Sequence, residues 1–184
     1  MQRIIITGPE STGKSVLSQE LAQHFNGSIV PEYARQYLSE LHRNYRMEDV
    51  LEIARVQLKE YSESRFAGNI VFFDTWLIIT KVWLEVVYKR EEKWIDEAIL
   101  STQGDHYLLC YPDIEWIPDP LRENGGKMRD VLFQRYKEIL IEKGLTYTII
   151  KGVGPVRTNK AIFAVEEHIK NHSQGDKSIP RKNT

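Results

Sequence analysis

The strongest constraint on this chain is an eight-residue segment near its N-terminus, with the sequence Gly8-Pro9-Glu10-Ser11-Thr12-Gly13-Lys14-Ser15. It matches the pattern G-x-x-x-x-G-K-[ST] at every fixed position. A β-branched apolar run at residues 3–7 precedes it, and residues 15–25 follow it with apolar side chains at helical spacing. A buried strand, a glycine-containing loop and a helix in this order predict a phosphate-binding loop.

The residue types in this loop suit the binding of a nucleoside triphosphate. Glycines let the backbone turn so that successive N–H groups point toward phosphate oxygens, and the helix adds the positive end of its dipole. Lys14 is long enough to reach the β- and γ-phosphates, and the Ser15 hydroxyl is a suitable ligand for Mg²⁺. We therefore expect residues 8–15 to bind ATP together with Mg²⁺.

Short apolar runs alternate with helical patterns along the rest of the chain. Strands are expected at residues 3–7, 28–30, 70–73, 107–111 and 147–150, and helices at residues 15–25, 33–41, 47–66, 77–88, 131–142 and 159–169. Strands that alternate with helices form parallel βαβ units, with helices on both faces of the sheet. The prediction is an α/β, three-layer P-loop NTPase fold with a five-stranded parallel sheet in the order 2-3-1-4-5.

Length and composition set the expected organisation. The 184 residues predict one P-loop domain at residues 1–172 and a polar, disordered tail at residues 173–184. A formal net charge of −1 gives no field that attracts nucleic acid, and no apolar stretch approaches the roughly 20 residues that span a bilayer. The single cysteine, Cys110, is expected in the core and suits a cytoplasmic protein. The sequence leaves the oligomeric state open, a homo-oligomer included.

Residues that distinguish the classes of P-loop proteins point to phosphoryl transfer. A guanine-nucleotide switch needs an Asn-Lys-x-Asp base reader, but residues 159–162 read Asn-Lys-Ala-Ile. A hydrolytic motor usually has a glutamate directly after its strand-end aspartate, but Asp74 is followed by Thr75. Transfer to a small molecule needs an acceptor-side carboxylate, a metal-side carboxylate and cations over the transferred phosphate.

Two carboxylates follow predicted strands, at the edge where parallel sheets bind ligands. We expect Glu32 to take the proton of the acceptor hydroxyl, with Arg35, one helical turn further on, as its partner or a substrate clamp. A surface cap on the next helix is the alternative for Glu32. Asp74 would be costly to bury without a partner, so we expect it to hold Mg²⁺ with Ser15 and to border the substrate. Asp74 is compatible with an additional role as a helix cap.

A segment with two adjacent glycines is the candidate lid over the transferred phosphate. Arg122 and Arg129 flank it, and their fork-shaped donors predict a catalytic role on phosphate oxygens. Asp119 is expected to bind substrate or to hold Arg122. Trp76 is the best candidate for an aromatic side chain that stacks on a flat substrate ring.

Four segments together resemble the ribosylnicotinamide kinase domain of the bifunctional bacterial NAD-biosynthesis regulators. They are the phosphate loop, Glu32-Tyr33-Ala34-Arg35, Phe73-Asp74-Thr75 with Ile79-Thr80, and Trp116-Ile117-Pro118-Asp119-Pro120-Leu121-Arg122. The resemblance implies ATP- and Mg²⁺-dependent phosphorylation of the 5′-hydroxyl of nicotinamide riboside, and it adds Tyr33 to the substrate-binding residues. The family commonly has an acid at the position of Trp76. If that acid holds the ribose, this chain takes another acceptor.

Two other functions stay open at this stage. One is a nucleotide-binding regulatory module that reports the ATP state to a partner, and the other is an ATPase without a small-molecule acceptor. By analogy with the fold, the base of ATP is expected near residues 152–157, after the fifth strand.

Overall fold

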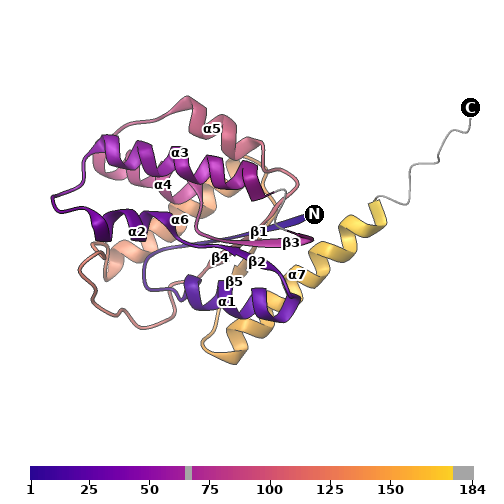
Figure 1. Ribbon diagram of the computed structural model, residues 1–184. Coiled ribbons are helices and arrows are strands. Elements are labelled where there is room, and N and C mark those ends of the chain that lie inside the picture. Colours follow the sequence, from indigo (N-terminus) through magenta and orange to yellow (C-terminus); the bar gives the residue numbers. More distant parts are fainter. Residues whose placement is uncertain (65–67, 176–184) are drawn as a thin grey trace, which may run out of the picture.

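The five predicted strands form one parallel sheet in the computed structural model, which describes residues 1–64 and 68–175 (Figure 1). The strands are β1 (Gln2–Thr7), β2 (Ser28–Val30), β3 (Ile70–Asp74), β4 (His106–Cys110) and β5 (Tyr147–Ile150). Their spatial order is β2-β3-β1-β4-β5. The predicted α/β fold class and strand order are therefore confirmed.

Helices cover both faces of this sheet. They are α1 (Lys14–Phe25), α2 (Tyr33–Glu40), α3 (Met47–Glu63), α4 (Leu77–Trp83), the π-helical turn η2 (Leu84–Tyr88), α5 (Lys93–Leu100), α6 (Lys127–Glu142) and α7 (Pro155–Gly175). Helices α1 and α7 lie on one face, while α3, α4, α5 and α6 lie on the other (Figure 1). The arrangement places the C-terminal ends of all five strands at one edge, next to the start of α1.

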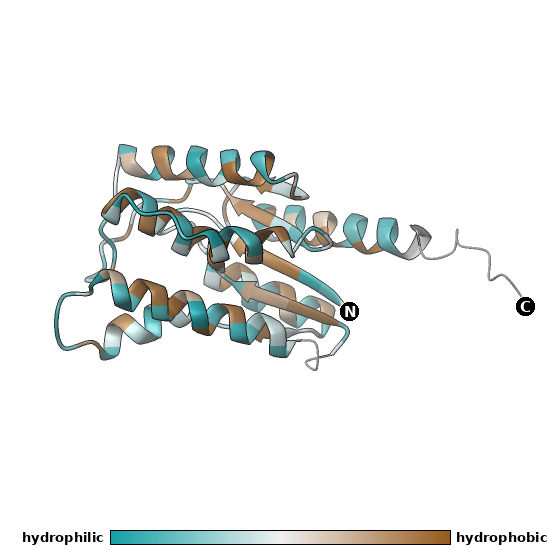
Figure 2. Ribbon diagram, turned by 90° about the horizontal axis from the view of Figure 1, so that it is seen from above, coloured by the Kyte–Doolittle hydropathy of each residue, from teal (hydrophilic) through white to brown (hydrophobic). Residues whose placement is uncertain are grey.

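The alternation of side chains along the strands builds two cores. Ile4 and Ile6 of β1 pack with Phe72 of β3 under α1 and α7, whereas Ile5 and Phe73 point to the opposite face. All five side chains are fully buried. Figure 2 shows the strands as almost continuously apolar and the helices as striped, the pattern expected when a sheet is covered on both faces. Cys110 lies in the core under α1, as expected.

Several helix boundaries differ from the prediction. Helix α5 was not predicted, because its eight residues are too short for a clear period. Helix α6 begins at Lys127 rather than residue 131, directly after Gly126 in a positive-φ conformation. Helix α7 includes residues 173–175 of the predicted tail, and residues 176–184 lie outside the described residues. Helix α3 ends at Glu63, and Phe66, the expected end of the 47–66 helix, lies outside the described residues. The domain limits remain a prediction.

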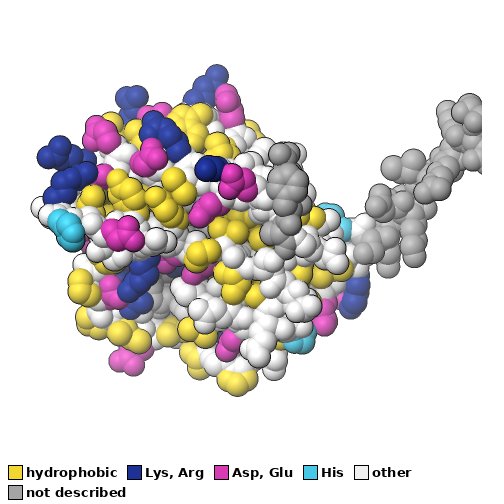
Figure 3. Space-filling model, in the orientation of Figure 1, with side chains coloured by type: hydrophobic (Ala, Val, Ile, Leu, Met, Phe, Trp, Pro, Cys, Tyr) yellow, Lys and Arg dark blue, Asp and Glu magenta, His cyan; other side chains and the backbone are white. Residues whose placement is uncertain are grey.

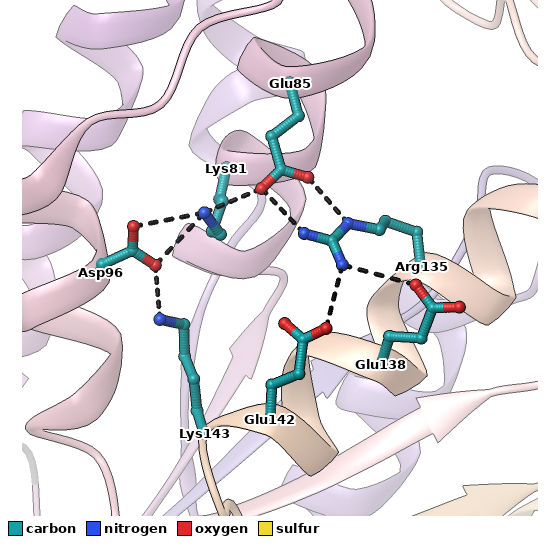
Figure 4. Close-up of polar contacts among 7 residues, drawn as sticks. All are labelled: Lys81, Glu85, Asp96, Arg135, Glu138, Glu142 and Lys143. Carbon is teal, nitrogen blue, oxygen red and sulfur yellow. Dashed lines mark hydrogen bonds and ion pairs between the residues drawn. The ribbon is translucent and has the colours of Figure 1, made fainter.

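An ion-pair network joins the helices on the α3–α6 side of the sheet (Figure 4). At its centre Glu85 of η2 receives two hydrogen bonds from the Arg135 guanidinium, at 2.9 and 3.1 Å, and one ion pair from Lys81 at 2.8 Å. Asp96 of α5 also pairs with Lys81, at 3.2 Å, and with Lys143 at the end of α6. The network thus fixes α4, η2, α5 and α6 relative to one another.

The surface carries both signs of charge. Figure 3 shows basic and acidic side chains interspersed on the visible face. Among the described residues, no helix has the length and apolar character needed to cross a membrane. The same part of the chain contains no group of three or more His, Cys, Asp or Glu side chains arranged to hold a metal ion by themselves.

Candidate nucleotide and acceptor site

The phosphate loop turns tightly between β1 and α1. Gly8 has a φ of 139°, and a Cβ atom there would lie 2.7 Å from the Cys110 carbonyl oxygen. Gly13, directly before α1, has a φ of 73°. Both backbone conformations are costly for residues with a Cβ, so the loop requires glycine at these two positions.

Side chains of the loop bind one of its own carbonyl groups. The Pro9 carbonyl accepts hydrogen bonds from the Lys14 ammonium at 2.9 Å and from the Thr12 hydroxyl at 2.8 Å. Within the described chain, no backbone N–H of residues 10–13 donates to a protein acceptor. Free N–H groups beside an ammonium and a helix N-terminus form a site for an anion.

The metal-side candidates meet at the end of β3. Asp74 is 5% exposed and pairs in register with Ile6 of β1. Its Oδ1 atom has no hydrogen-bond partner among the described residues. Burial raises the pKa of Asp74, although the nearby Ser15 hydroxyl and the Lys14 ammonium oppose this increase. A buried carboxylate oxygen without a partner, beside a hydroxyl at the phosphate loop, fits a Mg²⁺ site.

Glu32 lies between β2 and α2 and faces the phosphate loop. Because β2 pairs with β3, with Val30 opposite Phe73, the residue after β2 lies close to the end of β3. Glu32 is half-buried and makes no capping hydrogen bond to α2, in contrast to the alternative expectation. Burial raises its pKa, the Lys14 ammonium opposes the increase, and the Asp74 carboxylate adds to it. A carboxylate with a raised pKa beside the loop is suited to accept a proton.

The candidate clamp and lid residues are tied to several elements. Arg35 of α2 forms an ion pair with Asp119, whose other oxygen accepts the Leu121 N–H at 2.9 Å. Asp119 therefore binds Arg35 and not Arg122. The expected contact of Asp119 with substrate stays a prediction. The Arg122 guanidinium donates to the Ile117 carbonyl at 2.7 Å and lines the cavity described below.

Arg129 differs most from the expected lid residue. It lies in the first turn of α6 rather than in a mobile loop, is 7% exposed, and donates to the Ser11 carbonyl at 2.9 Å. The segment before it is also fastened, because Glu10 accepts hydrogen bonds from the Asn124 backbone and side-chain amides at 3.0 and 3.3 Å. Asn124 was not predicted from the sequence, since an asparagine in a glycine-rich loop has no distinctive signature.

Four of the predicted substrate residues are not among those that line the cavity: Tyr33, Asp74, Trp76 and Asp119. Trp76 is 1% exposed, stacks against Tyr61 at a ring-centroid distance of 4.6 Å, and donates its indole N–H to the Gln57 carbonyl at 3.1 Å. The prediction that Trp76 stacks on a substrate ring is therefore wrong, because its side chain packs into the core beside α3 and α4. Tyr33 is half-buried against Tyr37 and does not line the cavity either.

A cavity of about 500 Å³ connects the phosphate loop to an apolar region. One end is formed by residues 8 and 10–16 with Glu32 and Arg35. The other end was not predicted and is lined mainly by aliphatic and aromatic side chains: Leu38, Leu41, Tyr45, Ile79, Val82, Trp83, Val86, Val87, Leu121, Leu132 and Tyr136. These side chains come from segments that are far apart in the sequence, so no local motif marks them.

The same end also carries polar side chains, namely Arg43, Asn44, Gln57, Thr80 and Glu123. Gln57 of α3 is 3% exposed, and its side-chain oxygen accepts the Thr80 hydroxyl at 2.6 Å. Tyr45 packs edge-on against Trp83 at a centroid distance of 4.8 Å and donates to Glu123 at 2.8 Å. This end of the cavity can enclose a flat ring and offers it a few directed hydrogen-bonding groups.

The fold and the loop together define a P-loop nucleotide-binding protein. The sequence model of an AAA domain family matches residues 3–157, so the chain belongs to that family. It is 26% identical, over 82% of its length, to the trifunctional NAD biosynthesis/regulator protein NadR of Salmonella typhimurium. It is also 26% identical, over 78% of its length, to NadR of Escherichia coli. The chain spans 38% and 36% of these two relatives.

Solved structures extend the comparison. A NadR crystal structure in complex with NAD and AMP-PNP has a TM-score of 0.74 at 26% identity, over 91% of this chain and 49% of that one. A NadR structure in complex with NR, at 24% identity, has a TM-score of 0.75 over the same shares. A deoxyadenosine kinase from M. mycoides shares the fold, with a TM-score of 0.57 at 13% identity, over 92% of this chain and 100% of that one. The resemblance to the NAD-biosynthesis regulators is thus confirmed.

Proposed function

We propose that this protein is an ATP-dependent kinase that transfers the γ-phosphate to the 5′-hydroxyl of a nucleoside, with nicotinamide riboside as the preferred acceptor. One observation carries the proposal. Glu32, with its raised pKa, lies in the same cavity as the phosphate loop and an apolar pocket large enough for a flat ring. The similarity to NadR over most of this chain supports the choice of acceptor.

In this reaction Glu32 is the general base. The acceptor oxygen forms a bond to the γ-phosphorus while the bond from that phosphorus to the β–γ bridging oxygen breaks, and ADP leaves. The hydroxyl proton passes to a carboxylate oxygen of Glu32. Lys14, released from the Pro9 carbonyl, pairs with phosphate oxygens, and Arg122 is placed to neutralise charge on the transferred group. Ser15 and Asp74 would hold Mg²⁺, which supplies positive charge at the phosphates.

The apolar end suits the ring of nicotinamide riboside. That ring carries a positive charge, which the faces of Trp83 and Tyr45 favour. The side-chain oxygen of Gln57 already accepts a hydrogen bond from the Thr80 hydroxyl. The amide N–H groups of Gln57 therefore remain as donors for the carboxamide oxygen of nicotinamide. At the other end of the site, exposed Val153 and Val156 offer an apolar surface for the base of ATP.

The decisive experiment is incubation with Mg-ATP and a panel of nucleosides that includes nicotinamide riboside. A kinase consumes ATP slowly until an acceptor is added and then produces a phosphorylated nucleoside. Glu32→Gln is expected to reduce turnover by at least ~10²-fold while ATP binding persists. Glu40→Gln, at an exposed glutamate that ends the helix after Glu32, is the matched control and should leave turnover unchanged.

Two outcomes would favour the other functions. Tight ATP binding without any phosphorylated nucleoside would favour a regulatory module. Hydrolysis at the same rate with and without an acceptor would favour a simple ATPase. Unchanged turnover in Glu32→Gln would remove Glu32 from the mechanism.

A further inference from the structure

Two buried arginines that do not line the cavity contact the phosphate loop. Arg157, in the first turn of α7, donates to the Thr12 carbonyl at 2.9 Å. Arg129, in the first turn of α6, donates to the Ser11 carbonyl at 2.9 Å. Two helices from the C-terminal half of the chain therefore hold consecutive peptide groups of an N-terminal loop.

Arg157 is itself firmly anchored. Its guanidinium also donates to the Asp113 carboxylate at 2.7 Å and to the carbonyls of Gly152 and Tyr111, at 2.7 and 2.9 Å. The residue is 3% exposed and is absent from the residues that line the cavity. Arg157 can therefore act on a bound nucleotide only through the loop that it holds.

The orientation of these carbonyls fixes the orientation of the neighbouring N–H groups. The described peptide bonds are all trans, and in a planar trans peptide the C=O and the following N–H point in opposite directions. When Ser11 and Thr12 direct their carbonyls outward to arginines, the N–H groups of Thr12 and Gly13 point to the other side. These two N–H groups have no backbone partner in the described chain, so they are free for phosphate oxygens.

We propose that Arg157 and Arg129 are positioning residues that preorganise the anion-binding N–H groups of the phosphate loop. The inference rests on the nucleotide binding in the proposed function. It adds that affinity for the polyphosphate depends on two arginines outside the loop motif. Without them, the peptides of residues 11–13 rotate more freely, and an ordering cost is added to binding.

The test compares Arg157→Met with Arg157→Lys and with the exposed control Arg55→Met, whose guanidinium pairs with Glu52 one turn away on the surface. Calorimetry measures the affinities for Mg-ATP and inorganic tripolyphosphate, and thermal melts report stability. Arg157→Met should weaken both ligands about 10-fold to 100-fold, the loss expected for one charge-assisted hydrogen bond. Arg157→Lys should recover less than half of that loss on a logarithmic scale, since one ammonium cannot span four acceptors.

Several results would overturn the inference. One is an unchanged affinity of Arg157→Met for tripolyphosphate, whether or not the melting temperature falls. That result would mean that Arg157 does not organise the anion site. Full recovery by Arg157→Lys would mean that charge alone is responsible. If Arg157→Met does not fold, Arg129→Met and Arg157→Lys are measured by the same comparison.

For Arg129, a positioning role must also be distinguished from a catalytic role. A fall in kcat at unchanged ATP affinity in Arg129→Met would place this arginine on the transferred phosphate and contradict its positioning role. A wild-type protein that binds ATP and tripolyphosphate but phosphorylates no nucleoside would overturn the proposed function alone. The binding comparison at Arg157 would still decide the present inference.

Discussion

The two ends of the cavity are built in different ways. The phosphate end consists almost entirely of eight consecutive residues, shaped by two glycines and held by side-chain hydrogen bonds to its carbonyl groups. The acceptor end takes side chains from α2, α3, α4, η2, α6 and the segments 41–45 and 120–124. A contiguous backbone site depends on local sequence, whereas an assembled pocket depends on how distant helices pack. The phosphate end can therefore be predicted from the sequence, whereas the acceptor end cannot.

The same difference applies to what keeps each end in place. The phosphate loop is held by hydrogen bonds from the buried guanidiniums of Arg129 and Arg157. The wall formed by Trp83 and Val86 is held from behind, where Glu85 lies in the ion-pair network (Figure 4). Substitutions at the two ends should therefore separate cleanly into effects on ATP and effects on the acceptor.

The largest effect is expected at Lys14. Lys14→Met removes the ammonium that stabilises charge on the phosphates and should reduce kcat by about 10²–10³-fold. The fold should survive, since among the described residues the Lys14 ammonium bonds only the Pro9 carbonyl. Initial rates and a melting curve check this, with the exposed Lys93→Met as the control. A large loss of stability would show that the lysine is a fold element instead.

A smaller effect, confined to the acceptor, is expected at Gln57. Gln57→Leu removes the donors proposed for the ring and leaves the buried Thr80 hydroxyl without its partner. The acceptor KM should rise about 10-fold or more, with the KM for ATP unchanged. Gln134→Leu, an exposed position on α6, is the control. Equal changes in both KM values would break the separation between the two ends.

Removing the support behind the acceptor wall should have a still smaller effect on activity. Arg135→Met leaves the partly buried Glu85 with Lys81 as its remaining partner and should lower stability by about 1–3 kcal/mol. The acceptor KM should rise a few-fold, and the KM for ATP should not change. Denaturant titration and steady-state kinetics measure both quantities, with Arg90→Met, on the exposed surface, as the reference. A rise in the KM for ATP instead would contradict the assignment of this network to the acceptor end.

The smallest effect on activity is expected away from both ends, at the histidines between β4 and α7. Burial lowers the pKa of both His106 and His168 to about 4, against an ordinary value near 6.5. The unfolded chain therefore binds more protons in this interval, so stability should fall as the pH decreases from about 6.5 to 4. Asp105, whose pKa burial raises to about 6, partly offsets this dependence.

His168→Gln should reduce the slope of stability against pH in that interval and leave turnover at pH 7 unchanged. Melting curves at a series of pH values measure the slope, with the exposed His42→Gln as a control. A steeper slope in His168→Gln would contradict the sign of this pKa shift.

Sequence reasoning succeeded where a local pattern determines local structure. The order of strands and helices follows from apolar periodicity and the handedness of βαβ units, and the phosphate loop follows from fixed spacing. Glu32 could be placed at the cavity because it follows a parallel strand, and Asp74 could be placed at the end of the neighbouring strand. Their catalytic and metal-binding roles remain predictions.

Sequence reasoning failed where tertiary packing decides. Trp76 follows a strand-end carboxylate just as a site residue would, yet its indole finds a partner in the α3 backbone and turns inward. Arg157 occurs in a segment that suggested only a base-binding loop, and its four acceptors come from the phosphate loop, the segment after β4 and the segment after β5. Nothing local distinguishes such an arginine from one on the surface.

The most direct test of the central claim is the mass of the product formed from Mg-ATP and nicotinamide riboside or another nucleoside of the panel. The account predicts an acceptor heavier by about 80 mass units, the increment of one phosphoryl group. That product should nearly disappear in Glu32→Gln and persist in Glu40→Gln. ADP release without any heavier acceptor, or full product formation by Glu32→Gln, would contradict the account.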